Sequence, residues 1–303
     1  MTAEYKKSGA PSEAEFKDYS ANDREAHLEN TTSLPLHSRW KEEAAFFDKM
    51  ATDKAGQSLL LDSMAIQRYS SPELKRRFNK EYRFRVMGSL KKKRVLDVGC
   101  GDGLNSVLLA LMGAHVTGVD ISPKSIEMAQ RRAAENGVSD RTRFICSPIE
   151  TANLPEQYFD IIWGDSVLHH LLHDLDNIMH HLHRSAKPDG QFLFAEPINL
   201  CEPLRQLRRL VPVKFNGTSG ERPLVGSEIA LVQRYSSAFT LRCFSFLGRL
   251  DRFILVNHNY ERSPPIRRFL VNCINSLDYF VLSIPGIRRL AGVCVMHARP
   301  RSS

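Results

Sequence analysis

The sequence predicts an α/β protein with a doubly wound, mainly parallel sheet, a helical N-terminal segment and an insertion after the fifth strand. Two observations predict this class. Between residues 94 and 197, short apolar runs typical of buried strands alternate with segments of helical periodicity. The strand runs are apolar throughout rather than at every second residue, which indicates a sheet covered on both faces.

Residues 1–35 are polar and poor in aromatic and β-branched side chains, so we expect a disordered tail without a packed core. Residues 36–90 carry apolar groups at helical spacing in "WKEEAAFFDKMA" and "SLLLDSMAIQRY", which predicts a helical lid.

The core is expected to span residues 91–197. Its expected strands are residues 94–99, 115–121, 142–147, 159–164 and 190–197, and its expected helices are residues 104–113, 122–137 and 174–186. The second helix shows the clearest end signals, with Ser122 as N-cap, Pro123 in the first turn and Gly137 at its end.

Residues 198–235, rich in Pro, Arg and Gly, interrupt the alternation and are expected to form a cap over the substrate. The core is expected to resume over residues 236–303, with strands at 238–247 and 291–298 around a long apolar helix at 266–282. We expect the apolar stripe of that helix to pack in the core. A lipid-like substrate or a membrane surface is the less favoured alternative.

Composition narrows the function only a little. The formal charge of +8 suits nucleic acid, an acidic membrane surface or an anionic substrate without choosing among them. The six cysteines include no CxxC pair, so neither a disulfide framework nor a cysteine zinc site is indicated. No apolar leader and no apolar run of membrane-spanning length occurs, so we expect a cytoplasmic protein.

A glycine-rich turn carries the functional signal. The stretch "VLDVGCGDGLN" joins the first strand to the first helix, and Asp120 ends the second strand. Such a turn lets a ligand approach the backbone, and the carboxylate can accept both hydroxyls of a ribose. Asp97 and Asp102 bracket the glycines and would repel a pyrophosphate. They suit S-adenosylmethionine, which carries an ammonium and a sulfonium.

These motifs resemble those of class I S-adenosylmethionine-dependent methyltransferases. The later stretches "LPEQYFDIIWGDSVLHHL" and "AKPDGQFLFAEP" are similar to motifs of the small-molecule branch that includes the ubiquinone and menaquinone biosynthesis enzymes. The resemblance implies a Rossmann-like methyltransferase fold with a seven-stranded sheet whose last strand is antiparallel. It also implies S-adenosylmethionine as cofactor and methylation of a small organic molecule on O, N or C. The alternatives are a nucleic-acid methyltransferase and a non-catalytic protein that binds the cofactor.

The same resemblance assigns cofactor contacts residue by residue. Asp97 and the turn backbone would hold the methionine part, Asp120 the ribose hydroxyls, and Ile121 the adenine. Many relatives have an aspartate after the third strand, where this chain has Cys146 and Ser147, so Ser147 is a weak substitute. The full expected set is Asp97, Gly99, Cys100, Gly101, Gly103, Asp120, Ile121, Ser147 and Asp165. Asp165 is equally well explained as a turn cap.

Three residues are candidates for a general base. His169 and His170 follow the fourth strand, and Glu196 ends the fifth strand, where substrates lie in this fold. Glu196 could instead bind a substrate cation or an arginine. Arg205 and Arg209 in the cap are candidates to clamp a substrate carboxylate or phosphate. A solvated basic face is the favoured alternative for these arginines.

The stretch "HHLLHDLDNIMHHLH" holds six of the 11 histidines and raises the question of a metal. We expect it to divide into a loop and a helix that begins after Asp174 as N-cap. The six histidines then form no single cluster, although Asp176, His180 and His183 share one side of the helix. We expect no functional metal.

Overall fold

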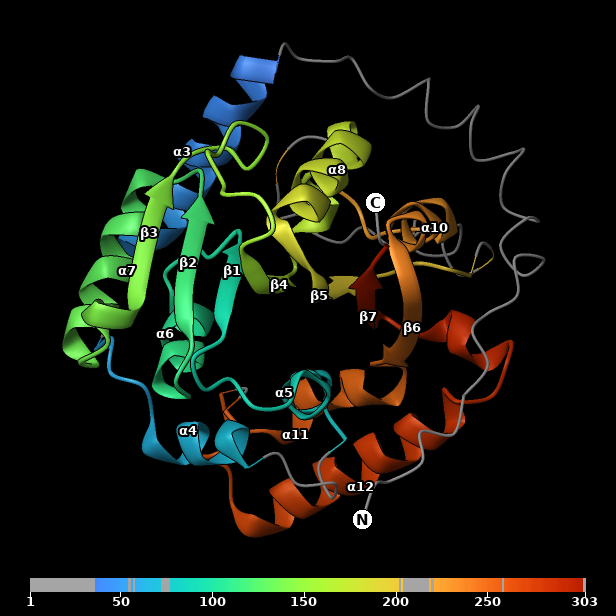
Figure 1. Ribbon diagram of the computed structural model, residues 1–303. Helices are drawn as coiled ribbons and strands as arrows, with labels where there is room; N and C mark the ends of the chain where they lie inside the picture. Colours follow the sequence, from blue (N-terminus) through green and yellow to red (C-terminus); the bar gives the residue numbers. More distant parts are fainter. Residues whose placement is uncertain are drawn as a thin grey trace.

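The computed structural model describes residues 36–53, 56, 58–71, 77–201, 203, 218, 221–257 and 259–301. Its centre is a seven-stranded sheet in the order β3-β2-β1-β4-β5-β7-β6 (Figure 1). The strands are β1 (Arg94–Val98), β2 (His115–Asp120), β3 (Thr142–Cys146), β4 (Phe159–Asp165), β5 (Ala186–Pro197), β6 (Ser236–Phe244) and β7 (Val293–Pro300). This confirms the α/β class and the seven-stranded, mainly parallel sheet.

One strand runs against the others. β7 is antiparallel to both of its neighbours, β5 and β6, whereas β1 pairs in parallel with β2 and β4. The expected antiparallel last strand is therefore confirmed. The order reverses at β1, between β2 and β4, and a crevice forms at such a switch point, outside the carboxyl ends of the strands.

Helices cover both faces of the sheet (Figure 1). The α-helices are α3 (Leu36–Asp53), α4 (Ser63–Ser70), α5 (Asn79–Met87), α6 (Leu104–Leu111), α7 (Pro123–Glu135), α8 (Leu175–Ser185), α10 (Gly226–Arg234), α11 (Asp251–Ile254) and α12 (Pro265–Val281). Short 3-10 turns are η1 (Ser139–Arg141), η2 (Leu168–His170), η3 (Leu172–Asp174), η4 (Leu247–Leu250) and η5 (Ile287–Leu290). Apolar side chains of α5 and α6 fill one core, and those of α8 and α10 fill the other.

The local end signals act as the sequence predicts at α7. Ser122 caps this helix by accepting a hydrogen bond from the Ser125 amide at 3.0 Å. Helix α8 begins at Leu175 as expected, but the Asp174 side chain accepts from the Asn177 amide group at 2.6 Å instead of capping the backbone.

The segment between β6 and β7 differs from the expectation. Residues 245–292 leave the sheet and form η4, α11, α12 and η5 before the chain returns as β7. The apolar stripe of α12 is exposed, with Ile266, Phe269 and Phe280 each more than 60% accessible, so the expectation of core packing is wrong. Hydrophobic periodicity identified the helix but could not tell which face points inward. No helix among the described residues is long and apolar enough to cross a membrane.

Candidate cofactor site and the adjoining histidine cluster

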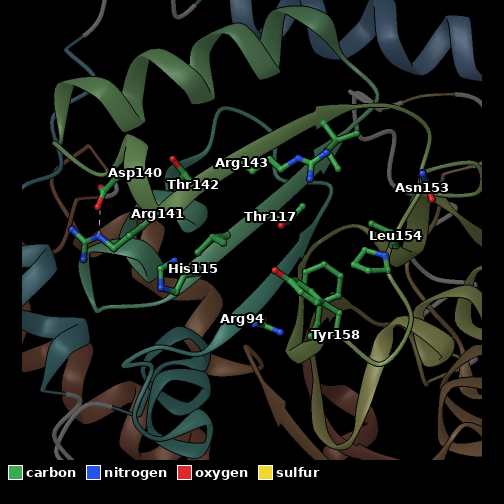
Figure 2. A pocket seen from close by; sticks show the side chains of 14 residues that line it. Arg94, His115, Thr117, Asp140, Arg141, Thr142, Arg143, Asn153, Leu154 and Tyr158 are labelled. Atoms are coloured by element: carbon green, nitrogen blue, oxygen red, sulfur yellow. Dashed lines mark ion pairs between the residues drawn. The ribbon is translucent and has the colours of Figure 1, made fainter.

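Two cavities lie at opposite ends of the parallel strands. The larger, of about 390 Å³, is bounded by the first residues of β1, β2 and β3, namely Arg94, His115 and Thr142 (Figure 2). It is open because β3 and β4 are joined by residues 147–158 without a helix, which leaves part of the sheet uncovered. Ligands of open α/β sheets bind at the carboxyl ends of the strands, so this cavity is not the expected cofactor site.

The second cavity, of about 200 Å³, lies at those carboxyl ends. The glycine turn, the end of β2 and the end of β4 contribute Gly99, Gly101, Asp120, Ile121 and Asp165 to its wall. Ser147 and His170 also line it. The structure thus brings together residues that the sequence expected at the cofactor, from three different strands.

The glycine turn is shaped by left-handed backbone at Gly99, Gly101 and Gly103, with φ of 63°, 52° and 76°. A Cβ at Gly99 would lie 2.5 Å from Val167, and one at Gly103 would lie 2.7 Å from Ala129. These two glycines permit close packing. A Cβ at Gly101 would meet nothing within 4 Å, because that position faces the open cavity.

Asp120 fastens the turn to β2. One of its carboxylate oxygens accepts from the Gly101 amide at 2.8 Å, and the other accepts from the Ser122 amide at 2.9 Å. Burial is the largest influence and raises the pKa of Asp120, while these two hydrogen bonds oppose the rise. Each oxygen retains a second lone pair, so the carboxylate can still accept two ligand hydroxyls.

Asp97 and Cys100 lie behind the turn rather than in the cavity wall. The Asp97 carboxylate is 1% exposed and accepts from the Ser106 hydroxyl at 2.6 Å. Burial raises its pKa to about 7, assisted by the nearby carboxylates Asp165 and Asp120. Cys100 is buried against Gly118, and burial raises the pKa of its thiol well above the usual value.

Asp165 is held by two donors. Its carboxylate accepts from Arg83 at 3.0 Å and from the Asn105 amide group at 3.0 Å. Burial alone would raise the pKa of Asp165, but the charge and hydrogen bond of Arg83, together with Lys80 and Asn105, outweigh it and the pKa lies below the usual value. Arg83 is itself buried and lies 4.2 Å from the centre of the Trp163 ring. The carboxylate therefore stays ionised at the cavity wall.

Helix α3 covers the cavity at the end toward which β2 and β3 point (Figure 1). Trp40, Glu43 and Phe47, spaced three and four residues apart, line the cavity from this helix. The Asp48 carboxylate accepts from the Ser122 hydroxyl at 2.6 Å and the Lys124 amide at 3.0 Å, which ties α3 to the start of α7. Sequence reasoning identified the helical segment but missed these cavity residues, although their helical spacing was visible.

The pKa values of two acidic side chains in the cavity wall, Glu43 and Glu150, are shifted in opposite directions. Burial raises the pKa of Glu43 to about 7, with Arg39 opposing the rise. Burial would also raise the pKa of Glu150, but hydrogen bonds from His173 and Trp40 bring it below the usual value. The cavity wall thus contains four carboxylates, of Glu43, Asp120, Glu150 and Asp165, and no Lys or Arg among the described residues that line it.

The candidate bases are not equivalent. His170 lines the cavity, whereas His169 and Glu196 do not. Glu196 is fully buried and accepts from the amides of Val167 and Leu168 at 2.9 and 2.8 Å. Its other oxygen lies 2.8 Å from His169 Nδ1 and accepts a hydrogen bond when this nitrogen is protonated. Glu196 therefore positions the loop after β4.

Glu221 meets both histidines from the other side. Its carboxylate oxygens lie 3.4 Å from His169 Nε2 and 3.7 Å from His170 Nδ1. Burial lowers the pKa of His170 to about 4, helped by the charge of His169 and opposed by Glu221. Sequence reasoning missed Glu221, because it lies about 50 residues beyond the histidines in a segment that matches no motif.

Glu221 and the two histidines also form a group of side chains of the kinds that bind metal ions. One atom from each of His169, His170 and Glu221 lies within 4.8 Å of the others, so these three side chains can approach one divalent ion.

Two of the three α8 residues that the sequence singled out as possible metal ligands, Asp176 and His183, have protein partners in the structure. Asp176 accepts from the Tyr235 hydroxyl at 2.7 Å, and His183 Nε2 contacts the Arg301 carbonyl at 2.8 Å. Arg205 and Arg209 lie outside the described residues.

Comparison with known proteins finds a family match within the core. Residues 96–194 match the sequence family described as a methyltransferase domain. This segment holds the glycine turn, Asp120, Asp165 and both candidate histidines. Residues 96–194 are therefore similar to methyltransferase domains in both the family match and the matched relatives.

Relatives and solved structures agree with this assignment. The chain is similar to a ubiquinone biosynthesis O-methyltransferase of Pseudomonas syringae pv. tomato, with 39% identity over 107 residues. A protein of the same description from Pseudomonas putida strain W619 is also 39% identical over 107 residues. Each match covers 35% of this chain and 45% of the relative, so the chain spans less than half the length of these relatives.

Two solved structures share the fold at low sequence identity. A phosphoethanolamine N-methyltransferase 2 of Haemonchus contortus superposes with a TM-score of 0.51 and 14% identity, covering 73% of this chain and 52% of that one. A proposed sarcosine dimethylglycine methyltransferase of Galdieria sulphuraria gives 0.51 and 16%, covering 84% and 97%. These likenesses establish a Rossmann-like methyltransferase fold.

Proposed function

We propose that this protein is an S-adenosylmethionine-dependent methyltransferase that acts on a small organic molecule. One observation carries the proposal. The cavity at the switch point is lined by four carboxylates and by no Lys or Arg among its described residues. Such a wall repels the pyrophosphate of a dinucleotide and attracts a cofactor that carries an ammonium and a sulfonium.

The cofactor's parts are assigned to this wall as follows. Gly101 and Asp165 face the methionine end, because Gly101 leaves open space and the Asp165 carboxylate stays ionised. Asp120 accepts the ribose hydroxyls with its remaining lone pairs. Ile121 and Ile149 offer apolar contact to the adenine. Asp97, behind the turn, acts on the ammonium through its charge.

Helix α3 would respond to the cofactor. The cavity of about 200 Å³ is smaller than the roughly 300 to 1,000 Å³ usual for ligand sites. Trp40 and Phe47 occupy part of its mouth. We therefore infer that α3 shifts outward when the cofactor enters and then covers it, which would exclude water from the reacting methyl group.

Methyl transfer is an in-line displacement in which the acceptor attacks the methyl carbon and the sulfonium leaves as a neutral thioether. A hydroxyl acceptor must lose its proton. Among the described histidines, His170 lines the cavity, and its lowered pKa of about 4 leaves the ring neutral at pH 7, with one nitrogen free to accept a proton. Glu221, 3.7 Å from His170 Nδ1, would stabilise the ring once it takes the proton. An oxygen acceptor is favoured because the matched relatives are described as O-methyltransferases.

The test is to incubate the protein with methyl-labelled S-adenosylmethionine and a metabolite extract, and then identify the small molecules that gain label. The expected result is label on a low-molecular-weight compound, accompanied by S-adenosylhomocysteine. Label on RNA or DNA would replace this proposal with a nucleic-acid methyltransferase. Cofactor binding without any labelled product, in extracts from several growth conditions, would instead support a non-catalytic binding protein.

Two glycine variants test whether the cofactor binds in this cavity. Gly101→Ala places a methyl group in open cavity space, at a residue with φ of 52°. Gly137→Ala is its matched control, because Gly137 has φ of 67° and also has nothing within 4 Å of an added Cβ, but it lies outside the cavity. Both changes carry similar backbone strain. Only Gly101→Ala is expected to weaken cofactor binding.

A further inference from the structure

Helix α12 directs one stripe of apolar side chains away from the protein. These side chains recur at spacings of three, four and seven residues and therefore share one face of the helix. The helix ends at Val281, and one further exposed apolar residue, Ile284, follows it. The large apolar members of the stripe are between 46% and 65% exposed and comprise Ile266, Phe269, Leu270, Leu277, Phe280 and Ile284.

The opposite face of α12 is packed through polar contacts that fix the orientation of the helix. Asn275 and Asp278 are buried there. The Asn275 amide group donates to the Asp251 carboxylate at 2.7 Å, and Asp278 accepts from the Leu247 amide at 2.7 Å. Turning the helix to bury its apolar face would break these bonds and leave the Leu247 amide without its acceptor. The outward stripe is therefore a consequence of well-satisfied packing on the inner side.

Two further exposed apolar residues lie in the short elements that contact α12. Leu250 and Phe253, at η4 and α11, are 47% and 72% exposed. Contiguous exposed apolar surface of this kind usually marks a site of interaction. In Figure 1, α12 lies at the edge of the molecule beyond α5 and α11, and no described helix or strand lies outside it.

The charge around this face selects the partner. Residues 245–292 contain seven arginines, no lysine and three acidic residues. Two of these acids are withdrawn from the surface charge, because Asp278 is buried and Glu261 pairs with Arg68 at 2.8 Å. Arg252, Arg262 and Arg267 are exposed. The segment that carries the apolar face is thus rich in exposed cationic side chains.

We propose that the α12 face docks this protein onto the surface of an anionic lipid bilayer, with the helix lying in the plane of the interface. An apolar stripe bordered by arginines is the arrangement of interfacial amphipathic helices, in which the apolar side enters the acyl boundary and the cations meet lipid phosphates. The helical part of the stripe, from Ile266 to Phe280, is about 21 Å long at 1.5 Å per residue, which suits contact along a flat surface. Pairing two copies through this face would instead bring like charges together.

Docking in this way leaves the cofactor cavity free. Helix α3, which covers the cavity, lies at the opposite end of the molecule from α12 in Figure 1. The inference is independent of the proposed activity, and the two can fail separately. Changes on the α12 face are expected to leave the binding of S-adenosylmethionine unaltered.

The test is co-sedimentation of the full chain with vesicles of phosphatidylcholine alone and of equimolar phosphatidylcholine and phosphatidylglycerol. We expect binding to the mixed vesicles, with much weaker binding to the neutral ones. Phe269→Ser is expected to lower the partition coefficient by roughly tenfold or more, because a buried phenyl side chain is lost from the lipid contact. Leu60→Ser is the matched control, since Leu60 and Phe269 are both 62% exposed. The control is expected to bind like the wild type.

The electrostatic part is tested with Arg262→Gln combined with Arg267→Gln, which is expected to reduce the preference for the anionic vesicles. Circular dichroism and thermal unfolding establish that each variant remains folded. Failure of the wild type to sediment with either vesicle would overturn the proposal. It would equally be overturned if Phe269→Ser converted a wild-type dimer to a monomer without changing sedimentation, because α12 would then be a subunit interface.

Discussion

Replacing Asp97 by Asn is expected to make the free protein more stable above neutral pH while weakening its hold on the cofactor. The native carboxylate is 1% exposed, and burial raises its pKa from 3.8 to about 7. The groups that influence it are the Ser106 hydroxyl, the carboxylates of Asp165 and Asp120, and the Lys80 ammonium. Because the folded state holds the proton more tightly than the unfolded state, its stabilisation is complete below the unfolded pKa. It is lost as the pH rises toward about 7.

The size of this effect follows from the pKa. A rise of roughly three units, at about 1.4 kcal/mol per unit, corresponds to a loss of about 4 kcal/mol of stability between acidic and alkaline pH. Asn cannot ionise and avoids this loss. Its amide oxygen can still accept from Ser106, but its NH2 group is buried without a partner, which costs about 1–3 kcal/mol. The variant is therefore expected to be less stable than the wild type at acidic pH and more stable, by about 1–3 kcal/mol, at alkaline pH.

The assay is urea unfolding of wild type and Asp97→Asn over a series of pH values from about 4 to about 8. The stability difference between the two proteins is expected to change sign across the series. Asp140→Asn is the control, because the Asp140 side chain is 76% exposed and its removal should produce no such crossing. If the difference between wild type and Asp97→Asn were the same at every pH, the reasoning from burial would be refuted.

The remaining predictions concern binding and turnover. Affinity for S-adenosylmethionine, measured by calorimetry, is expected to fall as pH drops below about 7, because Asp97 and Glu43 then take up protons. Glu43→Gln should flatten part of this pH dependence. A flat wild-type profile would contradict the prediction. Trp40→Ala is expected to raise the Kd for the cofactor, read by fluorescence titration, because α3 loses contact across the cavity mouth. His170→Ala is expected to lower kcat by about 10²- to 10⁴-fold, because His170 lines the cavity. The control is His180→Ala, at an exposed residue, which is expected to keep a kcat near that of the wild type. A kcat of His170→Ala equal to that of the wild type would exclude His170 as the base. Activity is expected to survive chelation of divalent ions, and loss of activity restored by one specific ion would instead assign His169, His170 and Glu221 to a metal.

The sequence predicted the fold well where local signals and global packing agree. Ser122 and Gly137 bound α7 because a side-chain oxygen and a left-handed glycine are what helix ends require. The glycine turn and Asp120 meet as expected, because the carboxyl ends of β1 and β2 lie at one edge of a parallel sheet.

Features that depend on contacts between residues far apart in the chain could not be predicted from local sequence signals. The direction of α12 is set by Asn275 and Asp278, whose partners lie in η4 and α11, and periodicity carries no information about those partners. Glu221 reaches His169 and His170 from a segment without a recognisable motif. The distinct surroundings of the two histidines follow from Glu196, which is buried against one and not the other.

The cofactor assignment is tested most directly by calorimetric titration of the protein with S-adenosylmethionine and, in parallel, with NAD. The four carboxylates of the cavity predict saturable binding of S-adenosylmethionine, its weakening by Gly101→Ala and not by Gly137→Ala, and no binding of NAD. Binding of NAD, or S-adenosylmethionine binding that Gly101→Ala leaves unchanged, would contradict the proposed site and its chemistry.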